Sequence, residues 1–186
     1  EAGRRIKLAG MELSEYVIPG LGGEAYSIEH ARETARALNA IDPDFIRLRT
    51  LHVVRGTPLM EMTRKGAFTP PGDDRIVLEI RALIDALSGI HSTVASDHIL
   101  NLLEEVQGRL PWDKPRMLSA IDRYLALSPE QRLVFRIGRR QGIYRRIDEL
   151  SDKGRYQELK QIVDHYEAQG KGPAEKNIAL LLNDYV

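Results

Sequence analysis

Glycine and glutamate gather in one short stretch, YVIPGLGGEAY, which spans residues 16–26. Because glycine lacks a Cβ, a turn this rich in it either bends tightly or approaches another group closely. Gly20, Gly22 and Gly23 do not have the G-x-G-x-x-G spacing of a dinucleotide-binding loop, and no Lys-Ser/Thr pair follows as in a Walker loop. The local pattern leaves two interpretations, a tight turn without a ligand and a turn that lines a small molecule.

Two further groups of polar residues lie within or directly after apolar, β-favouring runs. Arg47 and Arg49 alternate with apolar residues in FIRLRTLHVV, and Asp97 and His98 come directly after HSTVAS. Paired arginines bind carboxylate or phosphate groups, so they suggest an anionic substrate, whereas solvated arginines on an edge strand are the alternative. Asp97 can be an ordinary helix N-cap with an exposed His98 beside it, or both can contact substrate. We predict no metal site among these residues.

Composition excludes several chemistries. The chain of 186 residues has no cysteine, which excludes disulfides, thiolate nucleophiles and cysteine-bound metal within it. It carries 27 basic and 27 acidic residues, so no overall field attracts nucleic acid or anionic lipid. No apolar run approaches the roughly 20 residues that span a bilayer, and EAGRRIKLAG lacks the apolar core of a signal peptide. We therefore expect a cytoplasmic protein without a membrane partner.

The elements that position these residues alternate between strand and helix. Strands are predicted at 13–21, 45–54 and 91–96, with helices at 27–41 and 73–89 between them, and a first helix closed by Gly10. This order predicts an α/β fold with parallel strands. From Asp97 onward the pattern is helical, with helices expected at 97–108, 111–127, 128–140, 143–152, 156–170 and 173–186. Ser128 is expected to be the N-cap of the helix at 128–140. We expect a division into 1–110, which holds the strands, and 111–186, a helical accessory region.

Two motifs at a defined separation resemble the second half of radical S-adenosylmethionine enzymes, in the methylthiotransferase and elongator-like branches. There, one strand ends in G-[LF]-P-G-E and the next in R-x-G-T-P. Here the matching residues are Gly20, Leu21, Gly23 and Glu24, with Gly22 in place of proline, and then Gly56, Thr57 and Pro58. The resemblance covers residues 1 to about 95. It implies the last βα units of a partial TIM-type barrel, followed by the helical region.

The resemblance also implies a cofactor site. Gly20, Gly22, Gly23 and Glu24 would form a wall against the nucleoside of S-adenosylmethionine, and Leu51, His52 and Val53 would line its adenine, although the family's more common Tyr-Ser pair is absent. In such a barrel Arg47, Arg49, Asp97 and His98 would face the substrate. The family's C-x-x-x-C-x-x-C motif, which holds a four-iron–four-sulfur cluster, is missing. The chain is thus expected to be a C-terminal part that is inactive alone and pairs with a missing N-terminal half.

An alternative function uses the basic stretch between Arg132 and Arg146, which holds six arginines and no acid. It could make the protein a non-enzymatic interaction module that binds RNA. The commoner interpretation is a solvated, salt-bridged helix face or a surface that packs on the missing half, because apolar residues interleave with the arginines. Nucleic acid is therefore not the favoured partner. An incomplete sheet would also leave an edge exposed, through which we expect self-association.

Overall fold

The computed structural model describes residues 1–168, and the chain divides into two compact units after Ile121. Unit 1 is residues 1–121 and unit 2 is residues 122–186. Unit 1 contains a four-stranded sheet with helices beside it, which confirms the expected α/β class. The described part of unit 2 is helical. Among residues 1–168, none of the helices combines the length and the apolar character needed to cross a bilayer.

The sheet has its strands in sequence order. β1 (Ser14–Val17), β2 (Phe45–Leu48) and β3 (Thr93–Ala95) are parallel neighbours, and β4 (Gly108–Arg109) is antiparallel to β3. The three predicted strands are confirmed but shorter. Backbone hydrogen bonds from Arg49 to Val17 and from Leu51 to Pro19 continue the β1–β2 pairing beyond both strands. The segments that leave these two strands therefore run side by side.

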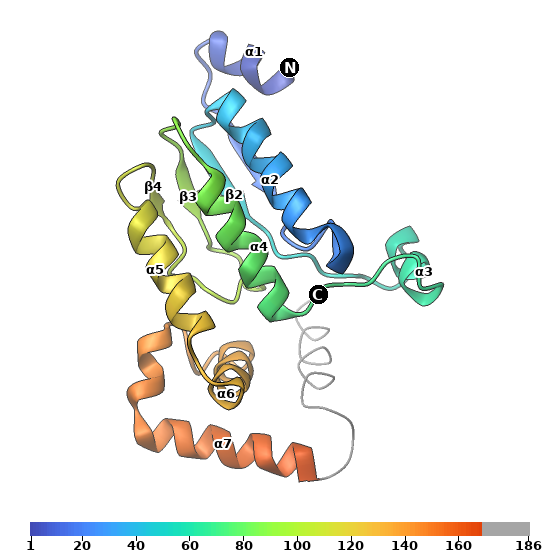
Figure 1. The fold of residues 1–186 in the computed structure, drawn as a ribbon, viewed down its shortest axis with the longest axis vertical. Coiled ribbons are helices and arrows are strands. Elements are labelled where there is room, and N and C mark those ends of the chain that lie inside the picture. Colours follow the sequence, from blue (N-terminus) through green and yellow to red (C-terminus); the bar gives the residue numbers. More distant parts are fainter. Residues whose placement is uncertain (169–186) are drawn as a thin grey trace. The chain divides into compact units, whose positions relative to one another are not determined.

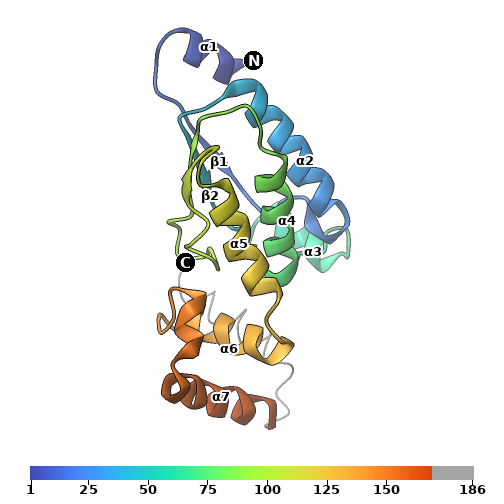
Figure 2. The same cartoon turned by 60° about the vertical axis from the view of Figure 1, so that its left-hand side comes forward.

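The two crossover helices of unit 1 lie on one face of this sheet. α2 (Gly23–Ile41) connects β1 to β2, α4 (Asp73–Ala86) lies between β2 and β3, and both pack on the same side, with the first part of α5 (Lys114–Leu125) beside α4 (Figures 1 and 2). The strand residues that face the helices are buried: Val17, Ile46, Leu48 and Val94. The alternate residues point to the opposite face, on which Figure 2 shows no helix of unit 1.

The two crossover helices follow the predicted apolar stripes. α2 buries Ala31, Ala35 and Leu38, and α4 buries a longer stripe against it. α2 starts at Gly23, four residues earlier than predicted, and Ser27, the first residue of the predicted helix, is fully buried within it. The first helix, α1 (Ala2–Leu8), ends as expected, with Gly10 at a φ of 74°.

The predicted helix at 97–108 is wrong. Apart from the start of β4, this segment is an irregular loop, although its apolar residues Leu100, Leu102, Leu103 and Val106 are buried. In place of regular helical bonds, the Asn101 side chain donates to the Leu48 carbonyl of β2 and the Ser96 hydroxyl donates to the Leu103 carbonyl of the same loop, as described below. The structure also adds a short helix that the sequence did not predict, α3 (Pro58–Arg64), which buries none of its residues and projects from the sheet in Figure 1.

Unit 2 begins in the last turn of α5 and continues through α6 (Pro129–Arg140), a 3-10 helix η1 (Ile147–Ser151) and α7 (Lys153–Ala168). Ser128 caps α6 by accepting a hydrogen bond from the Gln131 amide, which confirms the predicted cap. The predicted helix at 143–152 is reduced to η1. Tyr124, Phe135 and Tyr144 stack in the core of this unit. The helix predicted at 173–186 lies outside the described residues.

Candidate functional site

The carboxyl ends of β1, β2 and β3 meet at one edge of the sheet, because the three strands are parallel. The glycine turn leaves β1 there, the segment 49–57 leaves β2, and the loop 96–107 leaves β3. These are the three segments in which the sequence placed candidate binding residues. The fold therefore brings the candidate residues to one edge of unit 1.

An ion-pair cluster stands on the uncovered face at this edge. Arg47 Nη1 donates to Asp97 Oδ2 at 2.9 Å, and Arg49 Nη1 donates to Asp97 Oδ1 at 2.8 Å. Each guanidinium also lies over an aromatic ring, that of Arg47 over Phe45 at 5.6 Å and that of Arg49 over Tyr16 at 5.2 Å from the ring centroids. The two arginines thus point away from the helices, in the direction expected for residues that face a barrel interior.

The charges of this cluster shift two pKa values. The hydrogen bond from Arg49 is the largest influence on Asp97 and holds the pKa of this carboxyl below its ordinary value. Partial burial, and next the nearby charge of Arg49, lower the pKa of His98. The two arginines and one carboxylate leave an excess of one positive charge. The cluster is suited to binding an anion.

The glycine turn is anchored by an acidic residue that sequence reasoning missed. Glu79 of α4 is only 2% exposed, and its Oε1 accepts a hydrogen bond from the Gly20 amide at 2.9 Å. Its carboxylate also contacts Ser27 Oγ and His30 Nδ1 of α2, both at 2.8 Å. A signal was present: Glu79 stands on the apolar stripe of α4, three residues after Ile76 and four before Leu83. A lone acid on a buried helix face indicates a buried partner.

The glycines themselves approach other parts of the chain closely. A Cβ on Gly22 would lie 2.8 Å from His30 Cβ, and one on Gly23, whose φ is +64°, would lie 3.0 Å from the Phe68 ring. A Cβ on Gly20 would lie 3.2 Å from Leu51 Cβ. The turn is therefore a tight protein contact, and Gly20 and Leu51, both predicted to line a nucleoside, are neighbours. Their contact with a nucleoside stays a prediction.

Glu24 braces the segment that leads into α4. Its amide donates to Thr69 O at 2.9 Å, and its Oε1 accepts from the Gly72 amide at 3.3 Å. Arg75 Nη2 donates to the Glu24 carbonyl at 3.3 Å. Glu24 thus connects the glycine turn to the segment before α4 and to the first turn of α4. His52 and Val53 follow Leu51 in a half-buried, irregular segment.

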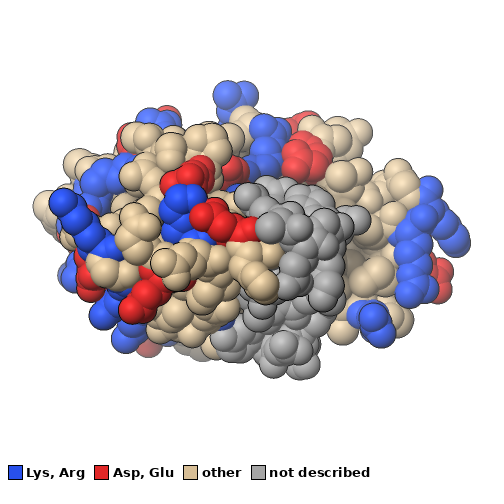
Figure 3. All heavy atoms as spheres, turned by 90° about the horizontal axis from the view of Figure 1, so that it is seen from below, with Lys and Arg blue, Asp and Glu red and all other residues tan. Residues whose placement is uncertain are grey.

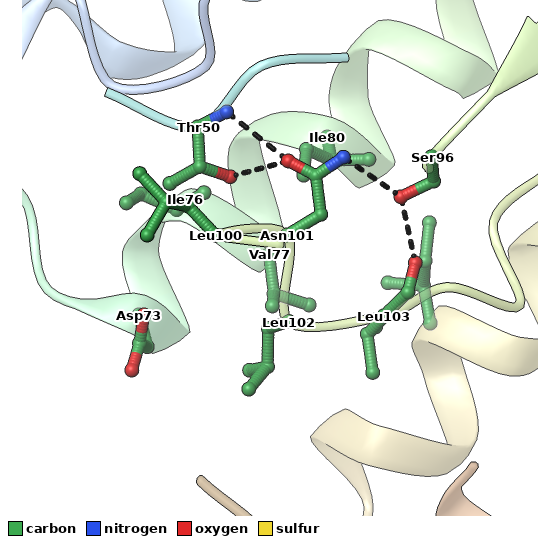
Figure 4. Close-up of a pocket in the computed structure, with 11 residues that line it drawn as sticks. Thr50, Asp73, Ile76, Val77, Ile80, Ser96, Leu100, Asn101, Leu102 and Leu103 are labelled. Carbon is green, nitrogen blue, oxygen red and sulfur yellow. Dashed lines mark hydrogen bonds between the residues drawn. The ribbon is translucent and has the colours of Figure 1, made fainter. Parts of the chain in front are cut away.

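Asn101 holds the irregular loop against the end of β2 (Figure 4). Its side chain, 1% exposed, accepts hydrogen bonds from the Thr50 amide and hydroxyl and donates to Leu48 O and Ser96 Oγ. Ser96 Oγ in turn donates to Leu103 O at 2.9 Å. The apolar pocket beside Asn101 has a volume of about 10 Å³, roughly the space of one water, so it does not hold a cofactor. The role of Asn101 is to fix the loop that carries Asp97 and His98.

Three of the six arginines in the basic stretch of unit 2 are buried, whereas Arg145 and Arg146 are exposed. Arg136, Arg139 and Arg140 are 8%, 7% and 3% exposed. On the face of the molecule shown in Figure 3, basic and acidic side chains lie side by side among the described residues. A nucleic acid needs an exposed basic surface, so these positions give the RNA-binding alternative little support.

The metal and cofactor capacity of the chain follows from its side chains. The sequence supplies no thiolate for an iron–sulfur cluster, and within residues 1–168 no three His, Asp or Glu side chains gather closely enough to hold a metal ion. Comparison of the chain with models of protein families, with curated proteins and with solved structures gives no match. The case for a function thus rests on the fold and on the edge described above.

Proposed function

We propose that unit 1 forms the last βα units of a partial barrel of the radical S-adenosylmethionine type. The observation that carries the proposal is the winding of the sheet: β1, β2 and β3 are sequential parallel neighbours, and both crossover helices lie on one face. Doubly wound nucleotide-binding sheets carry helices on both faces, whereas a barrel carries them only outside. The uncovered face is then the interior of the barrel.

The proposed substrate side is the carboxyl edge of this interior face. Barrel enzymes bind and transform substrates at the carboxyl ends of their strands. Arg47, Arg49 and Asp97 stand at this edge and project from the face that the helices leave open. In the proposed enzyme the two arginines bind and orient a substrate that carries a negative charge.

Of the proposed cofactors, residues 1–186 can contact the nucleoside of S-adenosylmethionine but cannot hold the iron–sulfur cluster. S-adenosylmethionine, bound beside a reduced four-iron–four-sulfur cluster, supplies a radical for hydrogen abstraction. Residues 1–186 have no thiolate to hold that cluster, so its ligands would come from another part of the same protein, and the chain alone is inactive. The nucleoside would lie along Leu51 and the glycine turn. Glu79 holds this turn in place through the Gly20 amide.

A titration with S-adenosylhomocysteine tests the cofactor site without requiring activity. We expect amide chemical-shift changes in the protein to concentrate in residues 20–24 and 51–53. Adenosine is expected to shift the same amides. Methionine, which lacks the nucleoside, is expected to leave them unchanged. Shifts spread over the surface, or none at millimolar ligand, would refute the nucleoside site.

The complete gene supplies a second and independent test. The proposal requires a C-x-x-x-C-x-x-C motif in the same reading frame, before the codon for Glu1. A complete reading frame without that motif would refute the radical enzyme while leaving the barrel-like winding of unit 1 intact.

A further inference from the structure

We propose that Arg47 and Arg49 form a binding site for a carboxylate or phosphate group of a small molecule, and that Asp97 occupies this site until such a ligand displaces it. The inference deepens the proposed function, because it names the ligand class of the uncovered face and adds an internal competitor. It rests on that face being the substrate side.

The position of Asp97 defines the spacing of the site. Each of its two carboxylate oxygens accepts from a different guanidinium, at 2.9 Å from Arg47 Nη1 and at 2.8 Å from Arg49 Nη1. The spacing of Arg47 Nη1 and Arg49 Nη1 therefore matches two oxygens that are bonded to the same carbon or phosphorus atom. A carboxylate and a phosphate both offer such a pair of oxygens, and guanidinium groups bind both strongly.

The arginines are held in place by contacts that do not involve Asp97. The rings of Phe45 and Tyr16 lie under the two guanidiniums, and Arg49 Nη1 also donates to Leu48 O at 2.9 Å. Stacking of this kind fixes a long side chain before a ligand arrives. A site that is already ordered loses less entropy on binding. The donors would thus stay close to their present positions after Asp97 leaves.

Asp97 can leave without disrupting the fold. Its side chain is 49% exposed, compared with 31% and 25% for Arg47 and Arg49, and exposed ion pairs stabilise proteins only weakly. Asn101 fixes the following loop through its bonds to Leu48 and Thr50, so rotation of the Asp97 side chain does not require that loop to move. Asp97 is therefore a weakly held occupant of an ordered site.

The charge balance also favours an external anion. The two guanidiniums face one carboxylate, which leaves one positive charge uncompensated, although the whole chain has a formal net charge of zero. A dianion that replaces Asp97 neutralises both guanidiniums. A monoanion restores the present balance and leaves the Asp97 carboxylate in water.

The test compares anion affinity in four proteins: the wild type, Asp97→Asn, Arg49→Gln and Glu33→Gln. Succinate and inorganic phosphate are titrated separately at constant ionic strength, and the amide shifts of residues 47–50 and 96–98 are followed. Removal of the competing charge should tighten binding about tenfold in Asp97→Asn. Arg49→Gln should lose the response. Glu33→Gln is the control for total charge, because Glu33 pairs with Arg36 on the exposed side of α2.

Each outcome decides one question. Saturable binding of succinate but not phosphate assigns a carboxylate ligand, the reverse assigns a phosphate, and both together assign a general two-oxygen anion site. An Asp97→Asn affinity equal to that of the wild type or of Glu33→Gln overturns Asp97 as the competitor. An undiminished response in Arg49→Gln, or no saturable binding of either anion, overturns the site.

The circular dichroism spectrum of each variant shows whether it is folded. Saturable anion binding without S-adenosylhomocysteine binding refutes the nucleoside site and leaves the anion site standing, so the two proposals fail separately.

Discussion

Replacement of Glu79 is expected to release the glycine turn, since three donors converge on its carboxylate. These donors are the Gly20 amide, Ser27 Oγ and His30 Nδ1, at 2.8–2.9 Å from a carboxylate that is 2% exposed. Glu79→Ala removes the acceptor and leaves the Gly20 amide and the Ser27 hydroxyl buried without it. A buried polar group that loses its partner costs about 1–3 kcal/mol, so we expect a loss of about 3–5 kcal/mol of unfolding free energy.

The milder substitution Glu79→Gln preserves shape and one acceptor oxygen. The hydroxyl of Ser27 and the ring nitrogen of His30 can each accept as well as donate, so the glutamine NH₂ group still finds a partner. We therefore expect a loss of about 1–2 kcal/mol for this variant. Asp85→Asn is the matched control, because Asp85 lies exposed on the same helix. It should change the unfolding free energy by less than about 0.5 kcal/mol.

Urea unfolding followed by circular dichroism measures the global effect, and hydrogen exchange of the Gly20 amide measures the local one. This amide donates to Glu79, so its protection should fall in both Glu79 variants and not in Asp85→Asn. If Gly20 exchanges at the wild-type rate in Glu79→Ala, the network does not anchor the turn. A stability order in which Gln is worse than Ala would equally contradict the hydrogen-bond argument.

Four further predictions concern other parts of the chain. Asn101→Ala should cost about 2–4 kcal/mol of unfolding free energy and raise hydrogen exchange in loop 96–107, because it removes buried hydrogen bonds to Leu48 and Thr50; unchanged exchange would contradict this. The lowered pKa of Asp97 means that its ion pairs stabilise the fold fully above the ordinary aspartate pKa and are lost as pH falls through the lowered value; a carboxyl NMR titration should show that pKa rise toward normal in Arg49→Gln. RNA binding at low salt should be absent in a filter assay, and salt-dependent retention would instead favour the basic stretch at 132–146. Because β1 has a free edge within the described sheet, light scattering should show self-association that rises with concentration, and a monomer at high concentration would refute it.

The sequence predicted the alternation of strand and helix in unit 1 because that signal is local. The apolar stripe of α4 and the short β-favouring runs lie within single segments, and the same is true of the Ser128 cap of α6. Local patterns did not predict α3, which buries no residue and therefore carries no apolar stripe against the core. They also placed a helix at 97–108, where the spacing of leucines is compatible with one, but Asn101 bonds to β2 and Ser96 bonds to Leu103 across the loop instead.

The candidate edge was predictable only in part. Gly20, Arg47 and Asp97 were each recognisable from their position in or directly after a predicted strand, since parallel strands end at a common edge. The partners were not recognisable in the same way. Glu79 is 59 residues from Gly20, and Asp97 is 50 residues from Arg47, so no local pattern links them.

The sequence by itself determined the composition of the site and the order of the elements that carry it. It supplied alternating strands and helices, arginines at a strand end, and a chain without a thiolate. The tertiary structure alone decided that both crossover helices lie on one face of the sheet, that Glu79 holds the glycine turn, and that Asp97 bridges Arg47 and Arg49. The physical reason is that side-chain period and propensity act over a few residues, whereas partners are chosen by packing between segments distant in the sequence.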